Sequence, residues 1–144
     1  MSNASRIFVA LDASDGAPVV LAAAMKLADL SGGKLVLFRA VGIPPDLPPA
    51  IFEMTNSRVE ETLLKNARKD LELHATAAEG RVEKIHAAFG TAWDTICREA
   101  KEVGADLIVI GSLGHSRFAR MLGTTAAKVV NNADLNVLVV RTIL

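Results

Sequence analysis

Short runs of mostly apolar residues alternate along the chain with longer segments in which apolar residues recur every three or four positions. The short runs are rich in β-branched side chains and predict buried strands, whereas the wider spacing predicts amphipathic helices. Strands are predicted at residues 6–11, 34–41, 81–89, 106–110 and 136–140. Helices are predicted at residues 19–30, 52–71, 92–103 and 124–131.

Proline, glycine and capping residues mark the limits of these elements. Pro18 belongs to the first turn of the first helix, where its missing N–H costs nothing, and Gly32 follows the end of that helix. Residues 42–50 contain four of the five prolines, so we expect a surface loop there. Thr91 is expected to cap the third helix, and Gly104 is expected to end it.

The alternation of strands and helices predicts a doubly wound α/β fold, in which a five-stranded parallel sheet carries helices on both faces. We expect residues 1–144 to form a single domain, because the length is in the usual range and no repeat or linker interrupts the pattern. Strand order 3-2-1-4-5 would make the first and fourth strands neighbours where the winding reverses, which is where ligands of such folds bind. Order 2-1-3-4-5 would instead place the third strand beside the first, and periodicity does not choose between the two.

Glycines follow the fourth predicted strand directly, at Gly111 and Gly114. Such glycines allow a tight turn and a close approach of the backbone to a ligand, because no Cβ is in the way. Further on, Gly123-Thr124-Thr125 opens the last helix, whose first N–H groups and two hydroxyls suit an anion. These features predict a phosphate pocket between two turns. The alternative is an ordinary strand-loop-helix connection, because Gly-x-x-Gly alone is a weak motif.

Composition and charge narrow the classes of function. Apolar residues make up 51% of the chain and charged residues 22%, which is enough for a proper core. Sixteen basic and sixteen acidic residues cancel, and no basic run is interleaved with aromatics, so we expect no nucleic-acid binding. The longest apolar run, residues 19–25, is far too short to span a bilayer, and no targeting segment precedes the first strand. We therefore expect no membrane insertion and a cytoplasmic location.

Cysteine and histidine usage points away from disulfides and zinc. The single Cys97 cannot form an internal disulfide, which fits a reducing compartment. It lies in an apolar helical pattern and is expected to be a small buried hydrophobe rather than a reactive thiol. His74, His86 and His115 are too scattered in the sequence to suggest a zinc site.

Over essentially its whole length the chain resembles single-domain universal stress proteins. The resemblance is carried by residues 9–14 (Val-Ala-Leu-Asp-Ala-Ser), by residues 106–112 (Asp-Leu-Ile-Val-Ile-Gly-Ser) with the glycine loop, and by residues 136–141 (Asn-Val-Leu-Val-Val-Arg). It implies strand order 3-2-1-4-5 and, in the branch with Gly-x2-Gly-x9-Gly-Ser/Thr, binding of ATP at the switch point. Here eight residues rather than nine separate Gly114 from Gly123.

Carried over by position, the resemblance implies a site for ATP, or for ADP or AMP, with Mg²⁺. The expected nucleotide-binding residues are Ala10, Leu11, Asp12, Val41, Ile110, Gly111, Ser112, Gly114, His115, Gly123, Thr124 and Thr125. In this assignment Asp12 and Val41 face the adenine and ribose, and Ile110, Gly111 and Gly114 face the ribose and α-phosphate. Gly123, Thr124 and Thr125 hold the outer phosphates.

Two parts of this set have alternative interpretations. The Asp12 carboxylate can accept a ribose hydroxyl or help to hold Mg²⁺, and the backbone of Val41 can meet an adenine edge, but an aspartate before a helix is just as often a turn or capping residue. His115, Arg117 and Arg120 can lend positive charge to phosphates or be ordinary solvated loop charges.

Three classes of function follow. The leading one is a nucleotide-binding regulatory protein with at most slow ATP hydrolysis, because no base is placed to activate water. The second is a dimeric interaction module of the same fold without nucleotide, and the third, an adenylyl- or phosphoryl-transfer enzyme, rests on fold analogy alone. We also expect a homodimer, because the last strand, which begins at Asn136 and is followed by Arg141, is an edge without charge or proline in its apolar part.

Overall fold

The structure is a computed structural model, and it describes residues 5–42, 49–112 and 122–142, apart from the side chains of residues 49–57. The strands in these ranges are β1 (Arg6–Ala10), β2 (Lys34–Val41), β3 (Val82–Phe89), β4 (Leu107–Gly111) and β5 (Asn136–Val140). The helices are α1 (Ala17–Ser31), α2 (Pro49–Ala77), α3 (Ala92–Glu102) and α4 (Thr124–Asn132).

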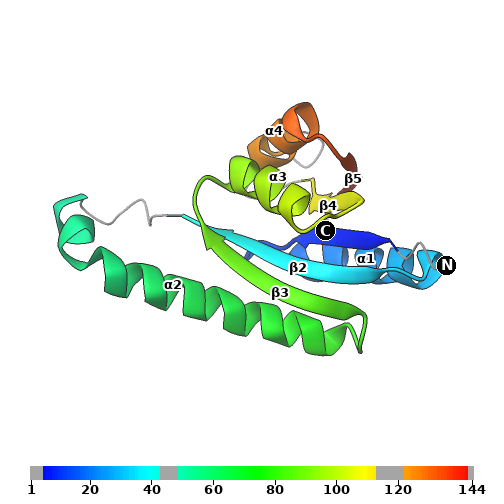
Figure 1. Cartoon of the computed structure of the whole chain (residues 1–144), viewed down its shortest axis with the longest axis horizontal. Helices are drawn as coiled ribbons and strands as arrows, with labels where there is room; N and C mark the ends of the chain where they lie inside the picture. The colour runs from blue at the N-terminus through cyan, green and yellow to red at the C-terminus, as the bar shows by residue number, and fades with distance from the viewer. Residues whose placement is uncertain (1–4, 43–48, 113–121, 143–144) are drawn as a thin grey trace.

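The strands form one parallel sheet in the order β3-β2-β1-β4-β5, as Figure 1 shows. The order 3-2-1-4-5 is therefore confirmed, and the alternative 2-1-3-4-5 is wrong. Central strand β1 lies between β2 and β4, with Val9 paired to Leu37 on one side and to Val109 on the other. The winding reverses between β1 and β4, which places the switch point at their carboxyl ends.

Two hydrophobic cores lie on opposite faces of the sheet. Alternate strand residues such as Val9 and Leu37 pack with α1 and α2, while their neighbours Phe8 and Phe38 pack with α3 and α4. This alternation follows from the two-residue period of a strand, which sends successive side chains to opposite faces. Helices on both faces, as the sequence predicted, are confirmed (Figure 1).

The ends of the helices mostly follow the expected local rules. Pro18 is in the first turn of α1, and Gly32 and Gly104 take the left-handed φ values of 70° and 71° just past α1 and α3. Thr91 is the N-cap residue of α3, but its side chain makes no capping hydrogen bond. Instead the Thr91 carbonyl accepts a bond of 2.6 Å from the Thr95 hydroxyl. The position of the cap was therefore predicted correctly. The hydroxyl that forms a hydrogen bond there is that of Thr95, one turn later, and not that of Thr91.

Helix α2 is longer than the sequence pattern indicated. It has 29 residues and begins at Pro49, inside the segment that the sequence predicted as a proline-rich loop. Proline suits a first helical turn because that turn needs no N–H donor, so the last proline of the segment starts the helix. Ala67 and Leu71 anchor its second half in the core. Within the described part of the chain, no helix combines the length and apolarity that crossing a membrane requires.

Candidate functional site

The switch point gathers three segments that lie far apart in the sequence. Leu11 and Asp12 follow β1, and the neighbouring β4 ends at Gly111 and is followed by Ser112. The start of α4 is tied to the same place, because the Gly123 N–H donates a bond of 2.6 Å to the Ser112 carbonyl. The structure thus brings the Asp12 loop, the end of β4 and the first turn of α4 to one edge of the sheet.

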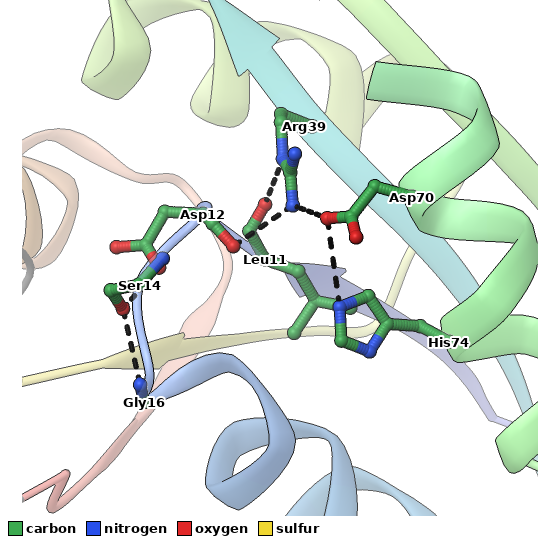
Figure 2. A network of polar contacts seen from close by, with 7 residues as sticks. All are labelled: Leu11, Asp12, Ser14, Gly16, Arg39, Asp70 and His74. Atoms are coloured by element: carbon green, nitrogen blue, oxygen red, sulfur yellow. Dashed lines mark hydrogen bonds and ion pairs between the residues drawn. The ribbon is translucent and has the colours of Figure 1, made fainter. Parts of the chain in front are cut away.

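Asp12 is exposed in the turn between β1 and α1. Its Oδ1 atom accepts hydrogen bonds from the Ser14 backbone N–H at 2.9 Å and from the Ser14 hydroxyl at 2.5 Å, and the Ser14 hydroxyl accepts one from the Gly16 N–H at 3.2 Å. Asp12 is therefore a turn residue, one of the two roles that the sequence allowed. Both bonds to Asp12 use one carboxylate oxygen, and they hold an exposed carboxylate in a defined orientation (Figure 2).

Arg39 is a residue of this edge that the sequence analysis missed. From β2 its guanidinium donates to the carbonyls of Leu11 and Asp12, at 2.9 Å each, and forms an ion pair with Asp70 of α2. His74, one turn further along α2, has its Nε2 atom 3.7 Å from the Asp70 carboxylate (Figure 2). The available signal was a single arginine within an otherwise apolar strand, but its partners could be known only after the strands were paired.

Gly111 is half-buried and Ser112 is buried, and both are packed closely against neighbouring segments. A Cβ on Gly111 would lie 3.0 Å from Cγ2 of Val20 and 3.1 Å from Cγ2 of Thr142. Ser112 is fully buried, and its hydroxyl accepts a bond of 3.1 Å from the Thr142 N–H. Close contacts from α1 and from the segment after β5 thus favour glycine at 111. The sequence analysis did not identify Thr142.

The first turn of α4 has side chains and backbone N–H groups that remain available to a ligand. Gly123 is buried, and its own N–H is used by Ser112, whereas Thr124 is exposed and Thr125 is half-buried. The N–H groups that begin a helix have no carbonyl partner one turn earlier within that helix. Thr124 and Thr125 are therefore the residues of this turn that can meet an anion.

The remaining predicted residues divide into buried supports and positions that the structure does not describe. Leu11, Val41 and Ile110 are buried and Ala10 is half-buried, so these residues can meet a ligand mainly through their backbone. The Val41 carbonyl already accepts a hydrogen bond of 2.9 Å from the Gly90 N–H. The predicted residues that lie outside the described part of the chain are Gly114, His115, Arg117 and Arg120. The eight-residue spacing between Gly114 and Gly123 also falls largely outside it.

The described residues indicate neither a metal site nor a reactive thiol. No group of three histidine, cysteine or acidic side chains within them is arranged to hold a metal ion. Cys97 is half-buried against the core of α3 and α4, and this burial, followed by the nearby carboxylates of Asp94 and Asp134, raises the pKa of its thiol. A raised pKa keeps the thiol protonated and unreactive, as the sequence predicted.

A groove of about 630 Å³ lies elsewhere, between β3 and the end of α3. Four of its polar side chains form two pairs: Arg6 Nε contacts Glu83 at 2.5 Å, and His86 Nε2 contacts Glu99 at 2.5 Å. Arg6 stands at the start of β1, so this groove is distant from the carboxyl ends of the strands. Because the groove lies away from the carboxyl ends of the strands, where ligands of doubly wound folds bind, the switch point remains the stronger candidate site.

Comparison with known proteins identifies the family. The family model described as "Universal stress protein family" matches residues 3–141. The chain belongs to the universal stress protein family. The resemblance inferred from the strand ends and the glycine loop is thereby confirmed.

Known universal stress proteins agree with the fold at several levels of similarity. Universal stress protein G of Shigella flexneri is 40% identical over 87 residues, and this match covers 58% of the chain and 61% of that relative, so it spans about three fifths of the curated relative. The structure of UspA from Lactobacillus plantarum matches with a TM-score of 0.76 at 26% identity, covering 95% of this chain and 97% of that one. A universal stress protein solved in complex with cAMP matches with a TM-score of 0.65 at 27% identity, covering 97% and 98%.

Proposed function

We propose that this universal stress protein binds an adenine nucleotide at the switch point between β1 and β4. The observation that carries the proposal is the 2.6 Å bond between the Gly123 N–H and the Ser112 carbonyl, which joins the first turn of α4 to the end of β4. It puts a helix start suited to phosphates at the same edge as the exposed Asp12 carboxylate. The related universal stress protein that binds cAMP supports the adenine class of ligand.

The chemistry of the residues assigns each end of the nucleotide. The Asp12 carboxylate would accept ribose hydroxyls, while Ile110, Gly111, Ser112 and the loop residues Gly114 and His115 would line the α-phosphate region. Thr124 and Thr125 would hold the outer phosphates through N–H groups and hydroxyls. The described residues offer no set of three metal ligands, so Mg²⁺ would be carried mainly by the phosphates, with Asp12 as the nearby carboxylate.

The activity we propose is regulation by nucleotide occupancy rather than rapid turnover. A bound nucleotide that contacts both the Asp12 loop and the first turn of α4 would favour the conformation in which they lie together. Thr124 and Thr125, the described residues at the outer-phosphate end, have no side chain that can act as a general base on water, so any hydrolysis of ATP would be slow.

Asp12→Asn tests the ribose end of the site. The change keeps the size of the side chain but removes the charge, and a hydrogen bond to a charged group contributes about 1.5–3 kcal/mol. We expect the affinity for Mg·ADP, measured by titration calorimetry, to fall roughly ten- to a hundredfold.

Asp15→Asn is the matched control, because Asp15 is an exposed aspartate in the same turn. It should leave the affinity unchanged. Mass spectrometry of any ligand released on denaturation of the wild-type protein identifies the bound species. A wild type that binds no adenine nucleotide, or an Asp12→Asn variant that binds as tightly as the wild type, would contradict the proposal.

A second candidate function, a dimeric interaction module, is favoured by the exposed edge of the sheet. Strand β5 is the last strand of the sheet, contains no charge or proline, and leaves Leu138 38% exposed. An unprotected edge strand is a template for pairing, and a twofold contact would join β5 to its copy in antiparallel orientation.

Leu138→Lys is expected to shift the dimer to monomer, because it places a charge at the centre of this contact. Light scattering at high micromolar concentration measures the mass. Leu30→Lys, which changes a leucine 78% exposed near the end of α1, is the control and should not alter the mass. A dimer that survives Leu138→Lys would show that the contact lies elsewhere, and a monomeric wild type would exclude it.

A further inference from the structure

The segment that carries Asp12 is held in place from outside its own loop. Strand β1 ends at Ala10, and the carbonyls of Leu11 and Asp12 lie beyond it. Both carbonyls accept hydrogen bonds of 2.9 Å from one guanidinium, through Nε and Nη2 of Arg39. Since a guanidinium is planar and rigid, two such bonds fix the relative orientation of two successive peptide groups.

Asp70 holds the same guanidinium from a third side. Its Oδ2 atom contacts Arg39 Nη2, the nitrogen that also donates to the Asp12 carbonyl (Figure 2). The side chain of Arg39 is only 13% exposed, so it is largely shielded from water. Removing it would leave the two carbonyls without a strong donor, and the segment would lose the orientation that these bonds impose.

Asp12 is oriented from both directions by these contacts. On the side-chain end, Ser14 donates to Oδ1. On the main-chain end, Arg39 holds the Asp12 carbonyl itself. The charge of Arg39 is already matched by Asp70, so the effect of Arg39 on a ligand would come through geometry rather than through its own charge.

We propose that Arg39 is a positioning residue that sets nucleotide affinity by fixing the Leu11–Asp12 backbone, with Asp70 of α2 orienting the guanidinium. This inference rests on the proposed function and deepens it. It links the long helix α2 to the ligand site through a single side chain.

Arg39→Met and Arg39→Lys separate the two contacts that Arg39 makes. Methionine keeps much of the stem volume but removes every donor. Lysine keeps the charge that pairs with Asp70 but cannot reproduce the rigid fork on two carbonyls. We expect both variants to weaken Mg·ADP binding at least tenfold in calorimetry. A lysine variant with wild-type affinity would show that only the ion pair to α2 matters, and would overturn the proposal.

Arg81→Met is the matched control for loss of an arginine of the same kind. Arg81 pairs with Asp29 of α1 at 2.6 Å and donates to the Ala78 carbonyl at 3.0 Å, but it directly precedes β3, away from the switch point. It should leave the nucleotide affinity unchanged. If Arg81→Met weakens binding as much as Arg39→Met, the effect is general destabilisation and the proposal is wrong.

A double-mutant cycle with Asp12→Asn distinguishes positioning from a merely structural role. If Arg39 acts through Asp12, the double variant should bind no more weakly than Asp12→Asn alone, whereas independent effects would multiply. A multiplicative result with normal wild-type binding would overturn this inference and leave the proposed function intact. A wild type that binds no adenine nucleotide would overturn the proposed function and this inference with it.

Discussion

Gly111→Val is expected to abolish detectable nucleotide binding and to destabilise the fold by about 1–3 kcal/mol, the range for overpacking a close-packed interior. Even a single added Cβ would meet Val20 at 3.0 Å and Thr142 at 3.1 Å, and valine adds two further methyl groups. To relieve these contacts, the side chains of Val20 and Thr142 or the end of β4 would have to move. A shift of Thr142 or of β4 would disturb Ser112, whose hydroxyl accepts a bond from the Thr142 N–H and whose carbonyl holds the start of α4.

Denaturant unfolding and calorimetry with Mg·ADP measure the two effects of this variant. Gly42→Ala is the control, because Gly42 likewise lies at the carboxyl end of a strand, directly after β2, but a Cβ there would have no neighbour within 4 Å. The control should keep both wild-type stability and wild-type affinity. A Gly111→Val protein of unchanged stability and affinity would show that β4 and its neighbours yield without affecting the site.

Phe38→Ala should destabilise the protein by about 3–5 kcal/mol, the usual cost of truncating a buried phenylalanine. Phe38 is fully buried and packs against Phe8, with ring centroids 5.0 Å apart. It also precedes Arg39, and its carbonyl accepts a bond of 2.9 Å from the Leu11 N–H. The variant should therefore lose nucleotide affinity as well, because the cavity undermines the part of β2 that supports the Asp12 loop.

Phe38→Leu is the companion change that separates cavity formation from loss of the ring itself. It keeps most of the apolar volume and should cost less than about 1.5 kcal/mol. Equilibrium unfolding in urea, with the midpoint and the slope both fitted, measures the difference. Equal destabilisation by alanine and leucine would mean that ring stacking with Phe8, rather than filled volume, stabilises this core.

The strands and most of the candidate site were accessible from the sequence because their signals are local. A β-branched run bounded by glycine or polar residues located β2 and β5 with correct limits. Asp12, Gly111 and Gly123 stood out for the same reason, since each adjoins the end or start of a predicted element. The start of α2 was placed too late, because composition alone cannot distinguish a proline that starts a helix from one that prevents it. Its end was placed too early, because the helix continues beyond its last regularly spaced apolar residue to Ala77.

The residues that organise the site depend on contacts between distant segments. Arg39 reaches Leu11 and Asp12 only because β2 lies beside β1, and it meets Asp70 only because α2 covers that face. Thr142 reaches Ser112 because β5 lies beside β4. No local pattern carries this information.

The hydrophobic period and the turn residues of this sequence were sufficient to determine its fold class, its elements and the loops that could bind a ligand. Residue patterns alone left the strand order open, and the tertiary structure decided it. Only the tertiary structure showed that Arg39 supports Asp12 and that packing explains Gly111. The physical reason is that propensity and periodicity act over a few residues, whereas a side chain's partners are set by strand register and helix packing across the whole chain.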